Sequence, residues 1–473
     1  MFELRLRLRT SFLVALAICA HPLMAKMSGR YDAIHSGTPW FDQRGQPISA
    51  HGGGIIRVGD IYYLFGEAHR DMTNAFAGFN CYSSTDLVNW RFESVALPMQ
   101  QSGPLGPETV GERPKVMRAP TTGDYVMFMH ADGLDYRSQF VGYATAKVAT
   151  GPYTFHGPLL FEGKPIKKWD MGTFQDKDGT GYILMHGGDI YRLAGDYRSV
   201  EAQVNKAMVH GFESPAMFRK GDTYYFLGSN LTGWERNDNY YFTAKSLDGP
   251  WIRKGFVAPK GSLTWNSQVT FVLPIKGERE TVFMFMGDRW SYPRQASAAT
   301  YVWQPLIVQG DRLSIPVYRD AWRIDVGAGK FRAGPVPGEI ITSTDRRVSY
   351  TGSWQKSEIG GPIHQVALDR DASFSVTFTG TQASLYSVAR PDGGYARVTL
   401  SDGHGVKLLS STVDMYSKYP VSNVKFVTPR LPRGKYTFSA SVVGEGWYWI
   451  NKKGERSGSA GHAVSFDHLD VRK

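Results

Sequence analysis

The sequence contains very little cysteine. Only two cysteines occur in 473 residues, Cys19 and Cys81. Cys19 lies in a predicted export signal, so Cys81 alone remains and an intramolecular disulfide framework is excluded. Such a protein must gain its stability from a large apolar core, which roughly 450 residues can form. We interpret Cys81 as a small buried apolar residue rather than a nucleophile.

The sequence also lacks an apolar run long enough to span a bilayer. The longest run near the N-terminus extends from Phe12 to Ala20 and follows Arg5, Arg7 and Arg9. A basic segment, a short apolar segment and then small residues are typical of a secretory signal peptide. The sequence therefore predicts a signal peptide over residues 1–25, a secreted or periplasmic location, and no association with a membrane.

No cluster of like charges stands out. The formal net charge is +11, from 54 basic and 43 acidic residues, but the basic residues are scattered along the chain. We find no nucleic-acid-binding motif, so nucleic acid is excluded as a partner and the charges are interpreted as solvated surface. The positive balance is compatible with an acidic polysaccharide.

Aromatic residues and glycines are abundant instead. Phe, Trp and Tyr make up 13% of the chain, which also has 52 glycines. Short aromatic runs separated by Gly and Asp-Gly turns predict an all-β protein. An excess of flat aromatic rings also suits the binding of sugars, whose apolar faces stack on them.

A pattern of one polar residue, a β-rich run, a turn and an aromatic or aliphatic strand occurs five times. The polar openers are 43 to 61 residues apart: His51, Glu112, Asp170, Glu213 and Gln268. The second strands end at Glu67, His130, His186, Gly228 and Gly287. One four-stranded sheet per repeat is the signature of a propeller, so we predict a five-bladed β-propeller over residues 30–325.

In a propeller the innermost strands line one axis, which brings equivalent positions of different repeats together. We therefore expect the five openers to ring one end of a central channel. Desolvating five polar groups is costly unless they serve one another or a ligand. A purely structural ring that holds water is the alternative.

A second domain is predicted over residues 340–473. The segment 336–338 resembles a linker, and short alternating strands separated by glycine turns follow it. This pattern favours a β-sandwich accessory domain.

Three carboxylates and an amide around one pocket suggest glycoside hydrolysis. That reaction needs a protonated carboxylic acid on the leaving oxygen and a group that activates or places water on the other side of the sugar. Burial and a neighbouring negative charge raise the pKa of one carboxyl so that it keeps its proton.

Several segments of the chain resemble glycoside hydrolase family 43, within it the exo-β-1,3-galactanase-like group. They are Ala50-His-Gly-Gly-Gly54, Glu112-Arg-Pro-Lys115, Trp169-Asp-Met171, Glu213-Ser-Pro-Ala-Met-Phe218, Thr232-Gly-Trp234, Ser267-Gln268 and Gly287-Asp-Arg-Trp290. The resemblance implies that Glu213 is the general acid and that Asp170 tunes its pKa and orients it. It also implies an inverting mechanism, with a carboxylate separation of roughly 6.5–9.5 Å.

One position departs from most of that family. The family usually has an aspartate base at the first opener, where this chain has His51, as the galactanase-like group does. By the resemblance, the residue that activates or positions the attacking water is Gln268 or Glu112. A neutral amide cannot accept a proton in its ordinary form, so Gln268 would position the water. Glu112 would act as the base or bind sugar hydroxyls.

Sugar contacts are expected from His51, Trp234, Trp290 and Trp265. In the accessory domain Trp447 and Trp449 are candidate stacking residues, with core packing as the alternative. Glu67 and Asp288 end second strands, where we expect capping or ion pairing. We predict a monomer that needs no cofactor; a structural Ca²⁺ is left open.

The resulting hypothesis is an exo-acting glycosidase that releases galactose from β-1,3-galactan or arabinogalactan side chains of plant-type polysaccharides. Two alternatives use the same scaffold: an α-L-arabinofuranosidase or β-xylosidase, and a sugar-binding propeller without turnover.

Overall fold

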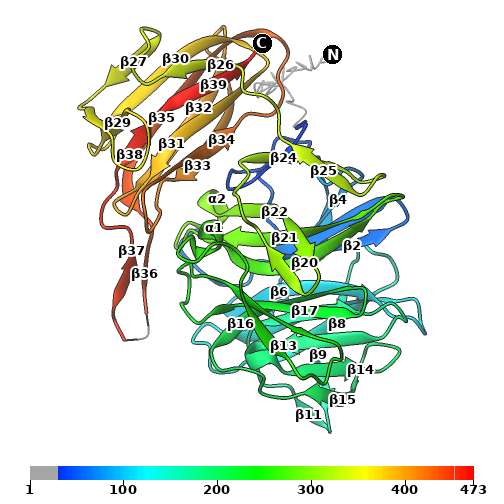
Figure 1. Ribbon diagram of the computed structural model, residues 1–473. Coiled ribbons are helices and arrows are strands. Elements are labelled where there is room, and N and C mark those ends of the chain that lie inside the picture. The colour runs from blue at the N-terminus through cyan, green and yellow to red at the C-terminus, as the bar shows by residue number, and fades with distance from the viewer. Residues whose placement is uncertain (1–29, 452) are drawn as a thin grey trace, which may run out of the picture.

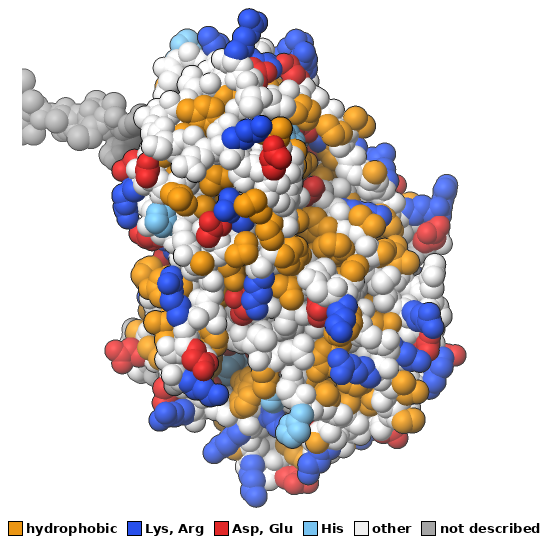
Figure 2. All heavy atoms as spheres, turned by 60° about the vertical axis from the view of Figure 1, so that its left-hand side comes forward, with side chains coloured by type: hydrophobic (Ala, Val, Ile, Leu, Met, Phe, Trp, Pro, Cys, Tyr) orange, Lys and Arg blue, Asp and Glu red, His pale blue; other side chains and the backbone are white. Residues whose placement is uncertain are grey.

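The computed structural model describes residues 30–451 and 453–473. The predicted signal peptide over residues 1–25 lies outside these residues. Among the helices that the model describes, none is long and apolar enough to cross a membrane. Basic and acidic side chains are interspersed on the face shown in Figure 2, as the scattered charges of the sequence predict.

The described chain is all-β, and five four-stranded antiparallel sheets follow one another along its N-terminal region (residues 30–333). The first three sheets consist of β2 (His51–Val58), β3 (Ile61–Glu67), β4 (Phe79–Ser84) and β5 (Arg91–Leu97); β6 (Thr109–Arg118), β7 (Tyr125–Gly133), β8 (Phe140–Ala146) and β9 (Thr154–Pro158); and β12 (Met171–Gln175), β13 (Gly181–Met185), β14 (Ile190–Leu193) and β15 (Val200–Asn205). The last two consist of β16 (Phe212–Lys220), β17 (Thr223–Asn230), β18 (Tyr240–Ala244) and β19 (Ile252–Phe256); and β20 (Gln268–Lys276), β21 (Thr281–Arg289), β22 (Thr300–Gln309) and β23 (Arg312–Ser314). Each sheet corresponds to one of the five sequence repeats.

The first strands of the five sheets contact one another in a ring. Strand β2 contacts β6, β6 contacts β12, β12 contacts β16, β16 contacts β20, and β20 returns to β2. A separate apolar core lies between each pair of neighbouring sheets, and the one between the fifth and first sheets contains Trp303 and Tyr62. Burial of apolar surface between neighbouring sheets therefore holds the first strands around a common centre.

Smaller elements complete the N-terminal region. The strands β1 (Ile34–His35), β24 (Ala321–Asp325) and β25 (Lys330–Ala333) form a three-stranded sheet, which ties the start of the described chain to the end of this region. The strands β10 (Leu160–Phe161) and β11 (Lys164–Pro165) form a hairpin. The short helices are η1 (His186–Gly188), α1 (Leu263–Asn266) and α2 (Gln295–Ala298).

The C-terminal region (residues 339–473) has two main antiparallel sheets. One contains β26 (Glu339–Thr342), β39 (His468–Arg472), β31 (Gln382–Ala389) and β34 (Val421–Val427) in that order. The other contains β27 (Val348–Thr351), β30 (Ser373–Gly380), β35 (Gly434–Gly446), β32 (Gly394–Asp402) and β33 (Lys407–Asp414). A small sheet of β28 (Gln355–Ser357), β29 (His364–Ala367) and β38 (Val464–Phe466), and a hairpin of β36 (Tyr448–Ile450) and β37 (Arg456–Gly458), complete the region. Side chains of both main sheets, Leu385 and Phe438 among them, share one apolar core.

Candidate active site

Four of the five predicted openers line one pocket of about 670 Å³. Glu112, Asp170, Glu213 and Gln268 come from or directly precede the first strands of four different sheets. A second hollow, of about 1040 Å³, lies at the opposite ends of these strands and is lined by Arg57, Arg118 and Arg219 together with apolar residues of the first strands. The openers thus converge at one end of the ring of first strands.

Backbone bulges directly follow three of the five openers, His51, Glu112 and Glu213. The residue after the opener has a positive φ in three sheets: Gly52 at 58°, Arg113 at 55° and Ser214 at 57°. The pairing register with the second strand shifts just beyond each of these residues. Such bulges re-aim side chains, and backbone strain of this kind concentrates at functional sites. Position 52 favours glycine, because its φ is +58° and an added Cβ would lie 2.0 Å from Oε1 of Glu67 and displace that carboxylate.

Each opener is paired with a residue at or near the end of the second strand. The registers place His51 opposite Glu67, Glu112 opposite His130, Glu213 opposite Ser229 and Gln268 opposite Asp288. In the third sheet the backbone N–H of His186 donates to the carbonyl of Asp170 at 3.1 Å. The site therefore has a second ring of polar residues.

Glu213 and Asp170 form a carboxyl pair with opposite protonation behaviour. Burial, and then the negative charge of Asp170, raise the pKa of Glu213 well above its usual value. Burial alone would raise the pKa of Asp170 too, but the charges of Arg113 and His130 and a hydrogen bond from the Ser214 N–H (2.8 Å) lower it. Glu213 is thus suited to hold a proton beside an ionised Asp170.

Gln268 is the hydrogen-bonding centre of the pocket. Its Oε1 accepts from Nη2 of Arg113 (2.8 Å) and from Nε1 of Trp290 (2.9 Å), two groups that can only donate. Its Nε2 donates to Oε1 of Glu213 (3.1 Å) and Oγ of Ser229 (2.9 Å). The amide therefore has a fixed orientation and touches the proton-holding carboxyl directly.

Arg113, which the sequence analysis did not single out, connects the two halves of this arrangement. Its Nε donates to Oδ1 of Asp170 (3.0 Å) while Nη2 holds Gln268, and its backbone N–H donates to Oε1 of Glu67 (2.8 Å). The side chain is buried and lines the pocket. A planar guanidinium can serve two acceptors in this way, whereas a lysine ammonium offers no fork.

We expect replacement of Arg113 by methionine to move the pH profile as well as reduce turnover. The positive charge of Arg113 lowers the pKa of Asp170, whereas burial raises it. Without the guanidinium the pKa of Asp170 rises, so the acidic limb of the kcat/KM profile moves to higher pH. Loss of the fixed geometry should lower kcat by about 10- to 100-fold. R113K keeps the positive charge, so it should restore the pH of the acidic limb but not the full kcat. R118M replaces an exposed residue at the end of the same strand and should change neither the acidic limb nor kcat. An unmoved acidic limb in R113M would contradict this role.

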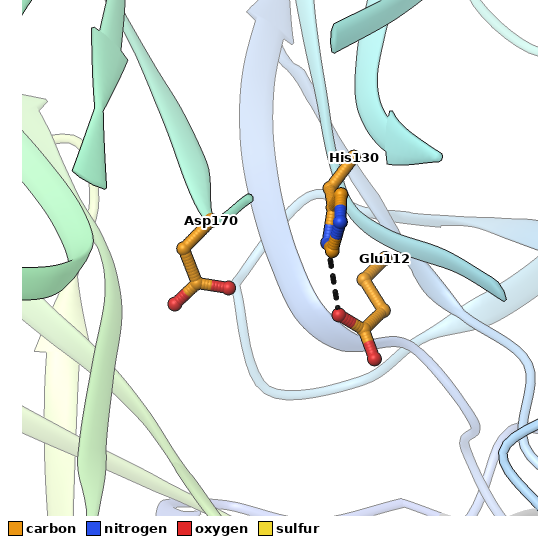
Figure 3. A group of neighbouring side chains, drawn as sticks. All are labelled: Glu112, His130 and Asp170. Carbon is orange, nitrogen blue, oxygen red and sulfur yellow. Dashed lines mark hydrogen bonds and ion pairs between the residues drawn. The ribbon is translucent and has the colours of Figure 1, made fainter. Parts of the chain in front are cut away.

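Glu112 belongs to a neighbouring group with His130. Oε2 of Glu112 lies 3.1 Å from Nδ1 of His130 (Figure 3). Oε1 of Glu112 accepts from the Tyr136 hydroxyl at 2.7 Å. The other ring nitrogen of His130 lies 3.2 Å from Oδ2 of Asp132. Burial opposes the charged imidazolium, but the hydrogen bonds to Asp132 and Glu112 raise the pKa of His130 to about 9.

The same group is the one place in the described chain where acidic and histidine ligands gather as a metal site would require. Ligand atoms of Glu112, His130 and Asp170 lie within 4.8 Å of one another (Figure 3). A metal-bound histidine must be neutral at the ligating nitrogen, whereas both ring nitrogens of His130 already lie within hydrogen-bond distance of a carboxylate oxygen, at 3.1 Å from Glu112 and 3.2 Å from Asp132. The geometry therefore fits a protonated histidine better than a metal ligand.

Aromatic rings form one wall of the pocket. Trp234 lies edge-on to Trp290 at 5.3 Å between ring centroids and stacks on Tyr292 at 5.7 Å. Trp169, which is 37% exposed, lines the pocket from the third sheet. Of the predicted sugar contacts, Trp234 and Trp290 thus line the pocket.

The other two predicted sugar contacts, His51 and Trp265, do not line it. Nδ1 of His51 lies 3.0 Å from Oδ1 of Asp288, and its ring stacks on Tyr301, so the side chain is only 2% exposed. The indole of Trp265 donates to the Ile315 carbonyl at 3.0 Å and packs on the core between the fourth and fifth sheets. Both residues therefore support the structure around the pocket rather than its wall.

Comparison with known proteins identifies the scaffold. Residues 47–262 match the model for glycosyl hydrolases family 43. A putative exo-β-1,3-galactanase from Bifidobacterium bifidum is 37% identical, with 59% of this chain and 95% of that chain covered and a TM-score of 0.56. The chain belongs to glycoside hydrolase family 43. It is accordingly a glycosidase, as the resemblance found in the sequence predicts.

Two further structures from family 43 relatives align with the chain. An exo-β-1,3-galactanase from Phanerochaete chrysosporium, solved with galactose, is 28% identical over 92% of this chain and 99% of that chain, with a TM-score of 0.70. One from Clostridium thermocellum is 27% identical over 73% of this chain and 86% of that chain, with a TM-score of 0.59. The fungal alignment includes most of the C-terminal region. No curated protein sequence matches the chain.

The pocket of this family 43 glycosidase contains the groups that hydrolysis of a glycosidic bond requires. One carboxyl, Glu213, has a pKa that burial and then the charge of Asp170 raise, as a proton donor to a leaving oxygen requires. Sequence reasoning missed Arg113, His130, Asp132, Tyr136 and Trp169 as pocket residues. A usable signal existed for His130, since polar residues at or near the ends of the second strands face the openers across the register.

Proposed function

We propose that the protein is an exo-acting, inverting galactosidase that releases galactose from the ends of β-1,3-galactan chains, such as those of arabinogalactan. The observation that carries the proposal is the Glu213 carboxyl, which accepts a hydrogen bond from Gln268 at 3.1 Å and lines a pocket with an aromatic wall together with Asp170. Burial and the charge of Asp170 raise the pKa of this carboxyl. The similarity to exo-β-1,3-galactanases from a fungus and two bacteria supports the choice of sugar and linkage. Two structures of the fungal enzyme, with one glutamate replaced, contain β-1,3-galactotriose.

In the proposed mechanism Glu213 donates its proton to the glycosidic oxygen while water attacks the anomeric carbon from the opposite face. Asp170 keeps Glu213 protonated and fixes the neighbouring Ser214 and Arg113. The two candidates for the residue that acts on water, Gln268 and Glu112, line the same pocket but differ in their chemistry. Gln268 is a neutral amide that would position water rather than take its proton, and one of its four hydrogen bonds, to Arg113, Trp290, Glu213 and Ser229, must give way for it to do so. Glu112 is a carboxylate that can accept the proton.

The proposal includes the architecture and setting of the enzyme. The five sheets, with their first strands in a ring, are interpreted as the blades of a β-propeller, and the two C-terminal sheets with a common core as a β-sandwich accessory domain. We further propose that the protein is exported, as its N-terminal sequence predicts, acts as a monomer and needs no cofactor for hydrolysis.

The experiment that tests the function is incubation with a panel of polysaccharides and aryl glycosides. We expect galactose as the sole product from β-1,3-galactan, and β-galactosides to be cleaved in preference to α-L-arabinofuranosides and β-xylosides. Chromatography of the released sugars measures the first result, and ¹H NMR of the initial anomer tests inversion. Release of arabinose or xylose alone would contradict the proposed specificity, and release of internal oligosaccharides would contradict the exo mode.

A further inference from the structure

A hairpin of the C-terminal region reaches the pocket of the N-terminal region. Strands β36 and β37 leave the end of β35 and run beside the N-terminal region (Figure 1). Trp449 and Ile450 of this hairpin line the same pocket as Glu213 and Trp234. The pocket wall is therefore built from both regions of the chain.

The base of the hairpin is anchored on the loop that follows β17. Trp447 is fully buried and stacks on Tyr416, with 5.2 Å between the ring centroids, and the Arg236 guanidinium lies 4.9 Å from the Trp447 ring. Nη2 of Arg236 donates to the Trp290 carbonyl (2.6 Å), and the Tyr416 hydroxyl donates to Oε2 of Glu235 (2.9 Å). These buried contacts fix the hairpin relative to the aromatic wall.

Trp449 lies directly over Gly233. A Cβ added at Gly233, whose φ is +59°, would lie 2.5 Å from Cη2 of Trp449, so only glycine permits this approach. The residues on either side of Gly233 also belong to the site. The backbone of Thr232 lies close enough to the Glu213 carboxyl to lower its pKa, and Trp234 belongs to the aromatic wall. Trp449 is therefore on the side of the pocket where Glu213 lies.

Because Trp449 lies on the same side of the pocket as Glu213, its position determines which sugar of the substrate it can contact. A general acid protonates the oxygen that links the cleaved sugar to the leaving group, so the leaving sugar departs on the acid's side. Trp449 is half-buried, and its ring is an apolar plane of the kind on which a pyranose stacks. Ile450, 57% exposed, extends the apolar surface outward along the hairpin.

We propose that Trp449 forms a binding subsite for the leaving-group sugar, supplied to the catalytic pocket by the C-terminal region. The inference rests on the proposed galactosidase function, which it deepens. Binding energy from this second sugar contributes to catalysis when it holds the glycosidic oxygen against Glu213. The C-terminal region is then part of the active site and not only an accessory domain.

The test compares two substrates that share the cleaved galactose and differ in the leaving group. β-1,3-Galactobiose places a sugar on Trp449, whereas β-galactosyl fluoride places only a fluoride ion there. We expect W449A to lower kcat/KM for the disaccharide by about 10- to 100-fold and to leave kcat/KM for the fluoride unchanged within about twofold. W449F should recover most of the loss because it keeps an aromatic plane.

Tyr448 supplies the matched control, because it is in the same strand, is exposed and lies outside the pocket. Y448A should change neither value. An equal loss on both substrates in W449A, or no loss on the disaccharide, would overturn the subsite. A wild-type protein that cleaves neither substrate would overturn the proposed function instead. Should W449A not fold, W449L, which keeps an apolar side chain without the aromatic plane, is expected to give the same selective loss.

Discussion

Replacement of Glu213 by glutamine should lower kcat for β-1,3-galactobiose by about 10³-fold, within the range that a general acid contributes. The sugar leaving group is a poor one and needs a proton as the glycosidic bond breaks. An amide of nearly the same shape occupies the position of Glu213 without a transferable proton. Kinetics of galactose release, with thermal unfolding to confirm an intact fold, measure the effect.

The leaving group distinguishes loss of the acid from a general disturbance of the pocket. An activated substrate such as β-galactosyl fluoride needs little protonation, so E213Q should retain most of its kcat on that substrate. E108Q, an equivalent change at an exposed carboxylate outside the pocket, is the matched control. Equal losses on the fluoride and the disaccharide would argue against a proton-donating role for Glu213.

The repeat pattern predicted which residues converge, because equivalent positions on five similar sheets must face a common centre. Glu112, Asp170, Glu213 and Gln268 are 43 to 156 residues apart in the sequence, yet they line one pocket. The family resemblance was carried by the same residues. The repeat pattern therefore predicted which carboxyl groups share the pocket.

The role of each opener depends on the side chains that contact it, and a sequence pattern does not reveal those contacts. His51 occupies an opener position, but Asp288 from the fifth sheet binds its ring and Tyr301 covers it, so it does not line the pocket. Arg113 follows an opener and has no pattern of its own. Its left-handed backbone conformation turns it toward Asp170 and Gln268.

The contribution of the C-terminal region was the least predictable part of the site. Trp447 and Trp449 are two residues apart and equally aromatic, but one is buried against Tyr416 and the other lines the pocket. The difference arises from how two separate regions pack together. Nothing in a strand pattern specifies such a contact, since the partner Gly233 lies more than 200 residues earlier in the chain.

Replacement of Asp170 by asparagine should reduce kcat by about 10²-fold and shift the alkaline limb of the pH profile to lower pH. The negative charge of Asp170 is the second cause, after burial, of the raised pKa of Glu213. Without that charge the pKa of Glu213 falls, so Glu213 loses its proton at a lower pH and activity is lost there. Burial remains, so the pKa should stay above its usual value and the shift should be partial.

The measurement is kcat/KM against pH for D170N and the wild type on the same disaccharide. Asp176 supplies the control, because it also pairs with an arginine, Arg219, but lies at the opposite end of β12. D176N should leave the alkaline limb in place. A limb that stays fixed or moves to higher pH in D170N would contradict electrostatic coupling between the two carboxyls. The sign of the shift therefore separates control of the Glu213 proton from simple loss of the Arg113 and Ser214 contacts, which would lower kcat at every pH.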